Sequence, residues 1–108
     1  MTAESHFRRR DAAGHVLPLG QILATPGALH ALEASGQTPA EFLNRHAAGD
    51  WGDIGQEDWG VNNRALHDGS RILSAFVTSL GERLWIITEA ADDQGQRCAT
   101  TLLLPDEY

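Results

Sequence analysis

The 108-residue chain lacks several features that would point directly to a function. Cys98 is its single cysteine, so no intramolecular disulfide can form, which fits a reducing cytosol. No run approaches the roughly 18 apolar residues that a membrane span requires. The polar start contains three arginines and no apolar stretch after them, unlike a signal peptide. These absences predict a soluble, cytoplasmic protein that makes no membrane contact.

Lysine is also absent, since all eight basic residues are arginines. The formal net charge is −7, and residues 50–108 carry all of it, with four arginines against eleven acids. An acidic surface repels phosphate backbones, so direct nucleic-acid binding is not expected. The charge suits solubility, or contact with a basic protein partner.

Catalytic and cofactor motifs are missing as well. The five histidines are scattered, without a His-x-x-x-His pair, so no metal or other cofactor is predicted. There is no Gly-x-Ser-x-Gly and no phosphate-cradling glycine loop. Cys98 falls in an expected strand, where a thiol usually acts as a small hydrophobe. The chain therefore favours a non-enzymatic interpretation.

Two Thr-Pro pairs mark helix starts. Thr25 and Thr38 are suited to cap a helix, and the proline after each suits the first helical position. The first helix is expected to stop at Gly36 and the second, which opens with a capping box, at Gly49.

A third helix is expected from about Gln56 to Asp68, with Gly69 as its stop. Residues 1–17 show no periodicity and are expected to form a flexible arm. Residues 18–108 would then form a single α+β domain.

Three apolar runs separated by turn residues fill the C-terminal part of the chain, at residues 71–78, 83–89 and 97–104. They predict a three-stranded antiparallel meander. With the three short N-terminal helices packed on it, the expected fold class is α+β.

Both faces of this sheet are largely apolar, whereas a sheet with one wet face alternates cleanly. A two-residue loop at Leu80-Gly81 would pair Phe76 with Trp85 and place Ile87 on the same face. That face is expected to be covered by a helix, by the arm or by a second copy of the chain. Phe76, Trp85 and Ile87 are the candidate contacts of such a homodimer.

The glycine-rich segment 49–60 contains Asp-Trp-Gly twice. Trp51 and Trp59, together with Asp50 and Asp53, form a candidate interaction site, because exposed aromatics ringed by polar groups mark protein contacts. The alternative is that both tryptophans cap the core from a loop.

Five polar residues are expected to meet where the third helix reaches the sheet. They would line a pocket or form a side-chain network that fixes the helix. They are Asn62, Ser74, Thr88, Glu89 and Thr101.

The enzyme alternative is a small, metal-independent, toxin-like ribonuclease. Several toxin nucleases have helices followed by a small antiparallel sheet and use sheet residues for proton transfer and phosphate stabilisation. The acidic charge opposes this interpretation. Its candidate residues are His67, Arg71, Ser74, Arg97 and Thr100.

Eight short motifs follow one another in order after residue 18. They are Leu19-Gly20, residues 24–29, Gly49-Asp50-Trp51-Gly52, Asn62, Ala65-Leu66, Gly69-x-Arg71-x-x-Ser74, residues 84–90, and Thr100-Thr101 through Tyr108. As a set they resemble a family of small proteins found on bacterial plasmids and integrated elements. Here residues 92–98 lengthen a turn that is shorter in relatives.

Members of that family often bear the name "type I restriction endonuclease subunit M". A methyltransferase subunit needs a cofactor-binding domain and an Asn-Pro-Pro-Tyr-type motif, and this chain has neither. The resemblance implies a non-enzymatic accessory protein of a mobile genetic element that acts by binding another protein. An anti-restriction or anti-CRISPR inhibitor is one form that such a protein would take.

Overall fold

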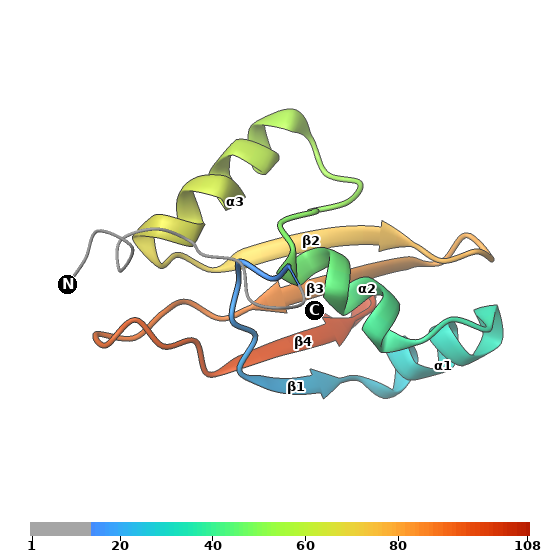
Figure 1. Cartoon of the computed structure of the whole chain (residues 1–108). Coiled ribbons are helices and arrows are strands. Elements are labelled where there is room, and N and C mark those ends of the chain that lie inside the picture. The colour runs from blue at the N-terminus through green and yellow to red at the C-terminus, as the bar shows by residue number, and fades with distance from the viewer. Residues whose placement is uncertain (1–13) are drawn as a thin grey trace.

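The computed structural model describes residues 14–108, which form three helices and a four-stranded sheet of the α+β class (Figure 1). In chain order the elements are β1 (Gln21–Ala24), α1 (Pro26–Ser35), α2 (Pro39–Ala47), α3 (Gln56–Asp68), β2 (Ile72–Val77), β3 (Arg83–Thr88), β4 (Ala99–Leu103) and the 3-10 turn η2 (Pro105–Glu107).

Local capping signals place the helices where the sequence predicts them. The hydroxyl of Thr25 accepts the amide of the third residue of α1 at 3.1 Å, and Gly36 is the C-cap of that helix. Thr38 accepts the corresponding amide of α2 at 3.4 Å. The bounds of α3 and its stop at Gly69 are confirmed, while α2 ends two residues before Gly49.

The sheet corrects the predicted fold. A three-stranded antiparallel meander is wrong, because Gln21–Ala24 forms a fourth strand, β1, that runs parallel to β4. The order is β1-β4-β3-β2, and the other two pairings are antiparallel. The sequence Gln-Ile-Leu-Ala of β1 does not alternate between polar and apolar residues, so it lacks the usual strand pattern. Its partner, β4, also lies near the other end of the chain, so the sequence around β1 does not indicate the pairing.

The β2–β3 hairpin differs from its predicted register by one residue, because Val77 rather than Thr78 pairs with Arg83. Thr78 and Glu82 close a three-residue loop, with the Thr78 amide donating to the Glu82 carbonyl at 2.8 Å. Gly81 takes a φ of 87° there, the left-handed conformation that such a loop requires at its last position.

A shift of one residue in a strand moves each side chain to the opposite face of the sheet. Phe76 therefore pairs with Leu84 and lies on the opposite face from Trp85 and Ile87. The prediction that Phe76, Trp85 and Ile87 share one face is wrong for this reason.

The main hydrophobic core lies between the sheet and the first two helices. Phe76, Leu84, Ile86 and Leu102 supply its sheet side, which we call the inner face, and each is at most 2% exposed. Its helical side consists of Ala28, Leu32, Phe42 and Leu43.

A second core joins α3 to the start of β2. Trp51, which is 0% exposed, packs there with Leu17, Ala65 and Ile72. Leu17 belongs to the arm that the sequence predicts, yet its amide donates to the Ala47 carbonyl at 3.1 Å. Residues 1–13 of that arm lie outside the described residues.

The loop before α3 covers the outer edge of β2. The Ala75 amide donates to the Trp51 carbonyl at 3.2 Å, and the Asp53 amide donates to the Ala75 carbonyl at 2.6 Å. Gly52 lies between them with a φ of 74°, and a Cβ on it would lie 2.1 Å from the Ala75 oxygen. Only glycine fits this close backbone approach.

We expect Gly52→Ala to lower the free energy of unfolding by about 1–3 kcal/mol, because the loop must shift or leave the β2 edge. Urea denaturation measures the change. The matched control is Gly60→Ala inside α3, where a Cβ meets its nearest atom at 3.6 Å. That substitution should stabilise the protein by up to about 1 kcal/mol. Losses of similar size in both variants would contradict the close-approach argument.

Candidate interaction surface

The face of the sheet opposite α1 and α2, which we call the outer face, is apolar and partly exposed. Ile87 and Leu103 are buried on it, whereas Val77 and Leu23 are 45% and 43% exposed. Strand alternation assigns to this face three polar residues, Gln21, Arg83 and Thr101, and the apolar residues Leu23, Leu73, Ala75, Val77, Trp85, Ile87, Ala99 and Leu103.

Two aromatic rings and a guanidinium stack at the C-terminal end of the chain on this face. The ring of Tyr108 meets Trp85 edge-on, with 5.9 Å between centroids. Arg71 lies with its guanidinium carbon 5.6 Å from the Tyr108 centroid and donates to the Tyr108 hydroxyl at 2.5 Å. Tyr108 is nevertheless 68% exposed. This stack therefore presents polar and aromatic atoms to solvent in a fixed arrangement.

The turn that carries Tyr108 is anchored by the preceding residue. The Glu107 carboxylate accepts hydrogen bonds from the Thr25 hydroxyl at 2.5 Å, from the Leu104 amide at 2.8 Å and from the Gly27 amide at 3.2 Å. These bonds, led by the one from Thr25, lower the pKa of Glu107. The start of α1 thus holds η2 in place and orients Tyr108 beside the sheet.

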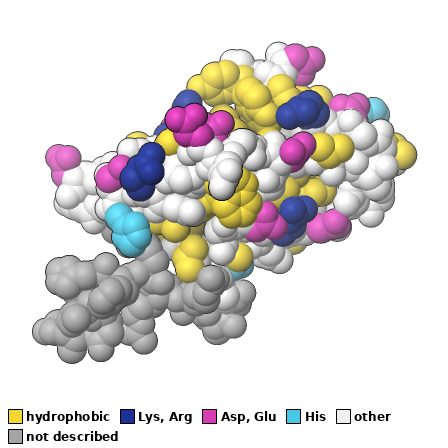
Figure 2. All heavy atoms as spheres, turned by 90° about the horizontal axis from the view of Figure 1, so that it is seen from above, with side chains coloured by type: hydrophobic (Ala, Val, Ile, Leu, Met, Phe, Trp, Pro, Cys, Tyr) yellow, Lys and Arg dark blue, Asp and Glu magenta, His cyan; other side chains and the backbone are white. Residues whose placement is uncertain are grey.

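A cavity of about 270 Å³ borders the stack, between α3, the loop before it and β2. Leu73, Val61 and Ile54 supply apolar walls, and Arg71 and Asp58 supply charges of opposite sign. Seen from above α3, the broadest of several hydrophobic areas lies at the top of the view, with arginine and acidic side chains beside it (Figure 2). An apolar centre with a charged rim is the usual anatomy of a protein-binding surface.

The two tryptophans of the predicted interaction site make structural contacts. Trp51 is completely buried and donates to the Asn63 side chain at 2.9 Å, and Trp59 donates to the Gly52 carbonyl at 3.1 Å. Asp50 accepts from Arg45 at 2.8 Å. Asp53 remains exposed and bonds through its backbone. Trp51 in the loop and Trp59 in α3 both pack in or against the second core.

A chain of buried polar side chains crosses the inner face under α2. His46 Nδ1 lies 2.5 Å from the Ser74 hydroxyl, and its Nε2 lies 2.8 Å from the Thr88 hydroxyl. Thr88 contacts Thr100 at 2.7 Å, and Thr100 donates to the Leu19 carbonyl at 2.7 Å. All four side chains are 0% exposed.

The last bond fixes the direction of the whole chain, because each hydroxyl has one proton to donate. Thr100 donates to Leu19, so Thr88 donates to Thr100, and His46 must donate to Thr88 from Nε2. Ser74 then donates to the unprotonated Nδ1. Burial, with a smaller contribution from Arg97, lowers the pKa of His46 to about 3, so the ring is neutral.

The predicted polar cluster assembles only in part. Ser74 and Thr88 meet through His46, while the Asn62 amide donates to the Leu73 carbonyl at 2.8 Å. Glu89 is exposed and Thr101 lies on the outer face. The predicted cluster does not include His46, although this residue follows Phe42 by four residues and thus shares the buried side of α2. The network ties α2 to the sheet rather than lining a pocket.

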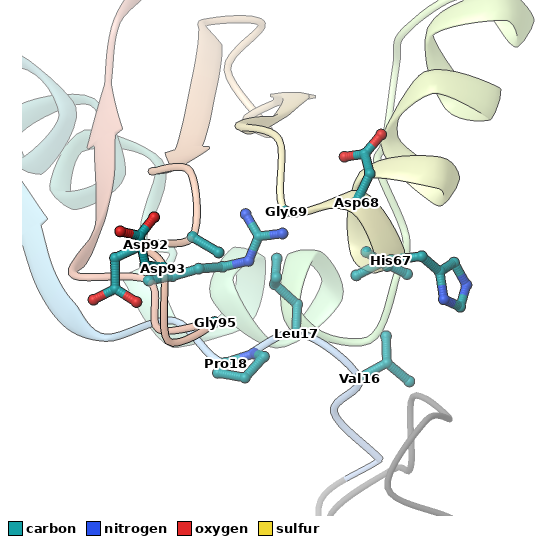
Figure 3. A pocket seen from close by; sticks show the side chains of 12 residues that line it. Val16, Leu17, Pro18, His67, Asp68, Gly69, Asp92, Asp93 and Gly95 are labelled. Carbon is teal, nitrogen blue, oxygen red and sulfur yellow. The ribbon is translucent and has the colours of Figure 1, made fainter. Parts of the chain in front are cut away.

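The proposed nuclease residues are spread over three places. Thr100 and Ser74 are buried in the network, and Arg71 stacks on Tyr108. His67 and Arg97 line a third place, a cavity of about 280 Å³ at the end of α3 (Figure 3).

That cavity is lined by acidic residues, and its side chains do not point toward a common centre. Asp68, Asp92 and Asp93 line it, and the ring of His67 points away from the latter two (Figure 3). Arg97 donates to the backbone carbonyls of Ser70 at 2.8 Å, Glu89 at 3.1 Å and Ala65 at 2.8 Å. Three carboxylates beside one guanidinium disfavour an RNA phosphate.

The described residues were also compared with the requirements of a metal site, a reactive cysteine and a membrane span. Residues 14–108 contain no group of three or more His, Cys, Asp or Glu side chains placed to hold a metal ion. Cys98 is exposed and free. None of the helices described between residues 14 and 108 combines the length and apolar character needed to cross a membrane.

Comparison with protein-family models, curated proteins and solved structures finds no match to the chain.

Proposed function

We propose that this chain acts by binding another protein through its outer face, as a non-enzymatic accessory protein of a mobile genetic element. The observation that carries the proposal is the Arg71–Tyr108–Trp85 stack, which stands beside an apolar cavity. Arginine, tyrosine and tryptophan are the residue types that contribute most to protein interfaces. The motif order described above suggests the genetic setting.

The chemistry of the surface defines the kind of partner. The cavity beside Leu73 suits one apolar side chain, and the Tyr108 hydroxyl and Arg71 offer polar contacts at its border. The net charge of −7 attracts a basic protein and speeds the encounter. A partner with an apolar anchor surrounded by basic residues fits all three features.

Affinity capture tests the proposal directly. The tagged chain is incubated with a lysate of its source organism, and retained proteins are identified and purified. We expect Tyr108→Ala to weaken binding of the purified partner about 30-fold, the equivalent of about 2 kcal/mol for a residue of this type. Tyr108 is exposed, so the fold should persist, which circular dichroism checks.

Leu80→Ala is the matched control, because Leu80 is 67% exposed but lies at the hairpin tip, away from the stack. Its affinity should equal that of the unchanged chain. Equal losses in the two variants, or no protein retained by the unchanged chain, would show that the proposal is wrong.

A further inference from the structure

The two edge strands of the sheet, β2 and β1, differ in whether another segment bonds to their outward backbone groups. Backbone bonds from the loop at Trp51 and Asp53 cover β2. At the opposite edge, β1 bonds to β4 through Gln21, whose amide donates to Cys98 at 3.0 Å, and the ladder continues at Thr25. Because the bonding direction alternates in a parallel ladder, the backbone groups of Ile22 and Ala24 point away from the sheet.

Within β1 there is no charged residue and no proline to hinder pairing at this edge. Natural edge strands carry charges, prolines or bulges that discourage contact with another strand. Between Val16 and Leu32 the chain has no Asp, Glu, Lys or Arg, although its net charge is −7. Ile22 and Leu23 of β1 are 44% and 43% exposed, one on each face of the sheet. Among residues 14–108 this edge is therefore apolar, uncharged and able to accept a strand.

The charge distribution identifies the occupant of this edge. Two copies of an acidic chain repel each other wherever their carboxylates approach. Residues 16–32 carry no charge, and the Glu107 carboxylate that Thr25 binds lies beyond the end of β1, so two β1 strands can pair without placing acids opposite each other. We propose that two copies of this chain associate by antiparallel pairing of their β1 strands.

The strand is self-complementary in one register. Ile22 lies opposite Ala24 of the second copy, and Leu23 lies opposite Leu23 of the second copy on the twofold axis. The outward amides and carbonyls of Ile22 and Ala24 then exchange hydrogen bonds across the axis. The two leucine side chains pack against each other on the outer face.

Such pairing joins two four-stranded sheets into one and sets two outer faces side by side. A partner with two anchors would then bind both copies and gain affinity by multivalency. The dimer itself does not depend on the proposed function, since β1 lies at the opposite edge from the Arg71 end of β2.

Sedimentation equilibrium of the full chain tests the pairing. We expect a mass of twice the 11.7 kDa chain, with dissociation on dilution. Leu23→Glu and Leu23→Lys should each be monomeric, because like charges would meet across the axis. An equimolar mixture of the two variants should recover the doubled mass. Recovery on mixing separates a broken interface from a failure to fold.

Leu29→Glu is the matched control, since Leu29 is 49% exposed in the same charge-free stretch but lies on α1. It should remain dimeric. A monomeric unchanged chain at concentrations up to about 1 mM would overturn the proposal. A dimer that persists in Leu23→Glu would also overturn the proposal. If that dimer were lost in Tyr108→Ala, the contact would lie on the outer face.

Discussion

Lowering the pH from 7.5 to 5.0 is expected to cost the protein about 2 kcal/mol of unfolding free energy through His46 alone. The pKa of this ring is about 3 in the folded protein and 6.5 in the unfolded chain. The unfolded state therefore binds more protons throughout this interval, and stability falls as the pH falls. The loss should reach about 4 kcal/mol near pH 3.

Between pH 5.0 and 7.5 the change in stability through His46 can be measured apart from the change through the carboxylates. Hydrogen bonds from Ser70 and Thr25 lower the pKa values of Asp68 and Glu107 respectively, so their contributions disappear only in more acidic solution. Urea denaturation at several pH values between 5.0 and 7.5 measures the slope of stability against pH.

His46→Gln tests the assignment, because glutamine keeps one acceptor for Ser74 and one donor for Thr88 but does not ionise. We expect this variant to lose most of the pH dependence. The control His67→Gln replaces an exposed histidine of α3, and this variant should keep the pH dependence of the unchanged chain. An unchanged slope in His46→Gln would contradict a buried neutral ring.

What the sequence reveals about this fold depends on how local each signal is. The caps at Thr25 and Thr38 and the stop at Gly69 act within a few residues, and they predict the helices well. β1 has no local signal because, within residues 14–108, it pairs with the distant strand β4. The hairpin register depends on whether Leu80-Gly81 forms a two-residue or a three-residue loop, and glycine suits both.

The same distinction applies to the candidate sites. Trp85 is recognisable as an aromatic residue on an apolar strand, but Tyr108 reaches it only because Glu107 is anchored by Thr25 at the far end of the sequence. The buried network likewise takes its members from α2 and three strands. Spacing along one element cannot show which polar residues of several elements will meet.

Replacement of Trp51 by alanine is expected to cost about 3–5 kcal/mol, the range for truncation of a fully buried large aromatic residue. The side chain is 0% exposed and contacts the rings of both His46 and Trp59, at 5.5 and 6.5 Å between centroids. Its removal leaves a cavity in the second core and strips the Asn63 side chain of its donor. A loss of this size is comparable with the whole stability of a small domain.

Thermal and urea unfolding of Trp51→Ala and Trp51→Phe measure this contribution. Phenylalanine restores part of the volume without the indole N–H, so Trp51→Phe should lie between the alanine variant and the unchanged chain. Leu80→Ala, at an exposed position, should change stability by less than about 0.5 kcal/mol. If Trp51→Ala instead unfolded like Leu80→Ala, the indole could not be buried in the second core. The loop would then regain Trp51 as a surface residue available to a partner.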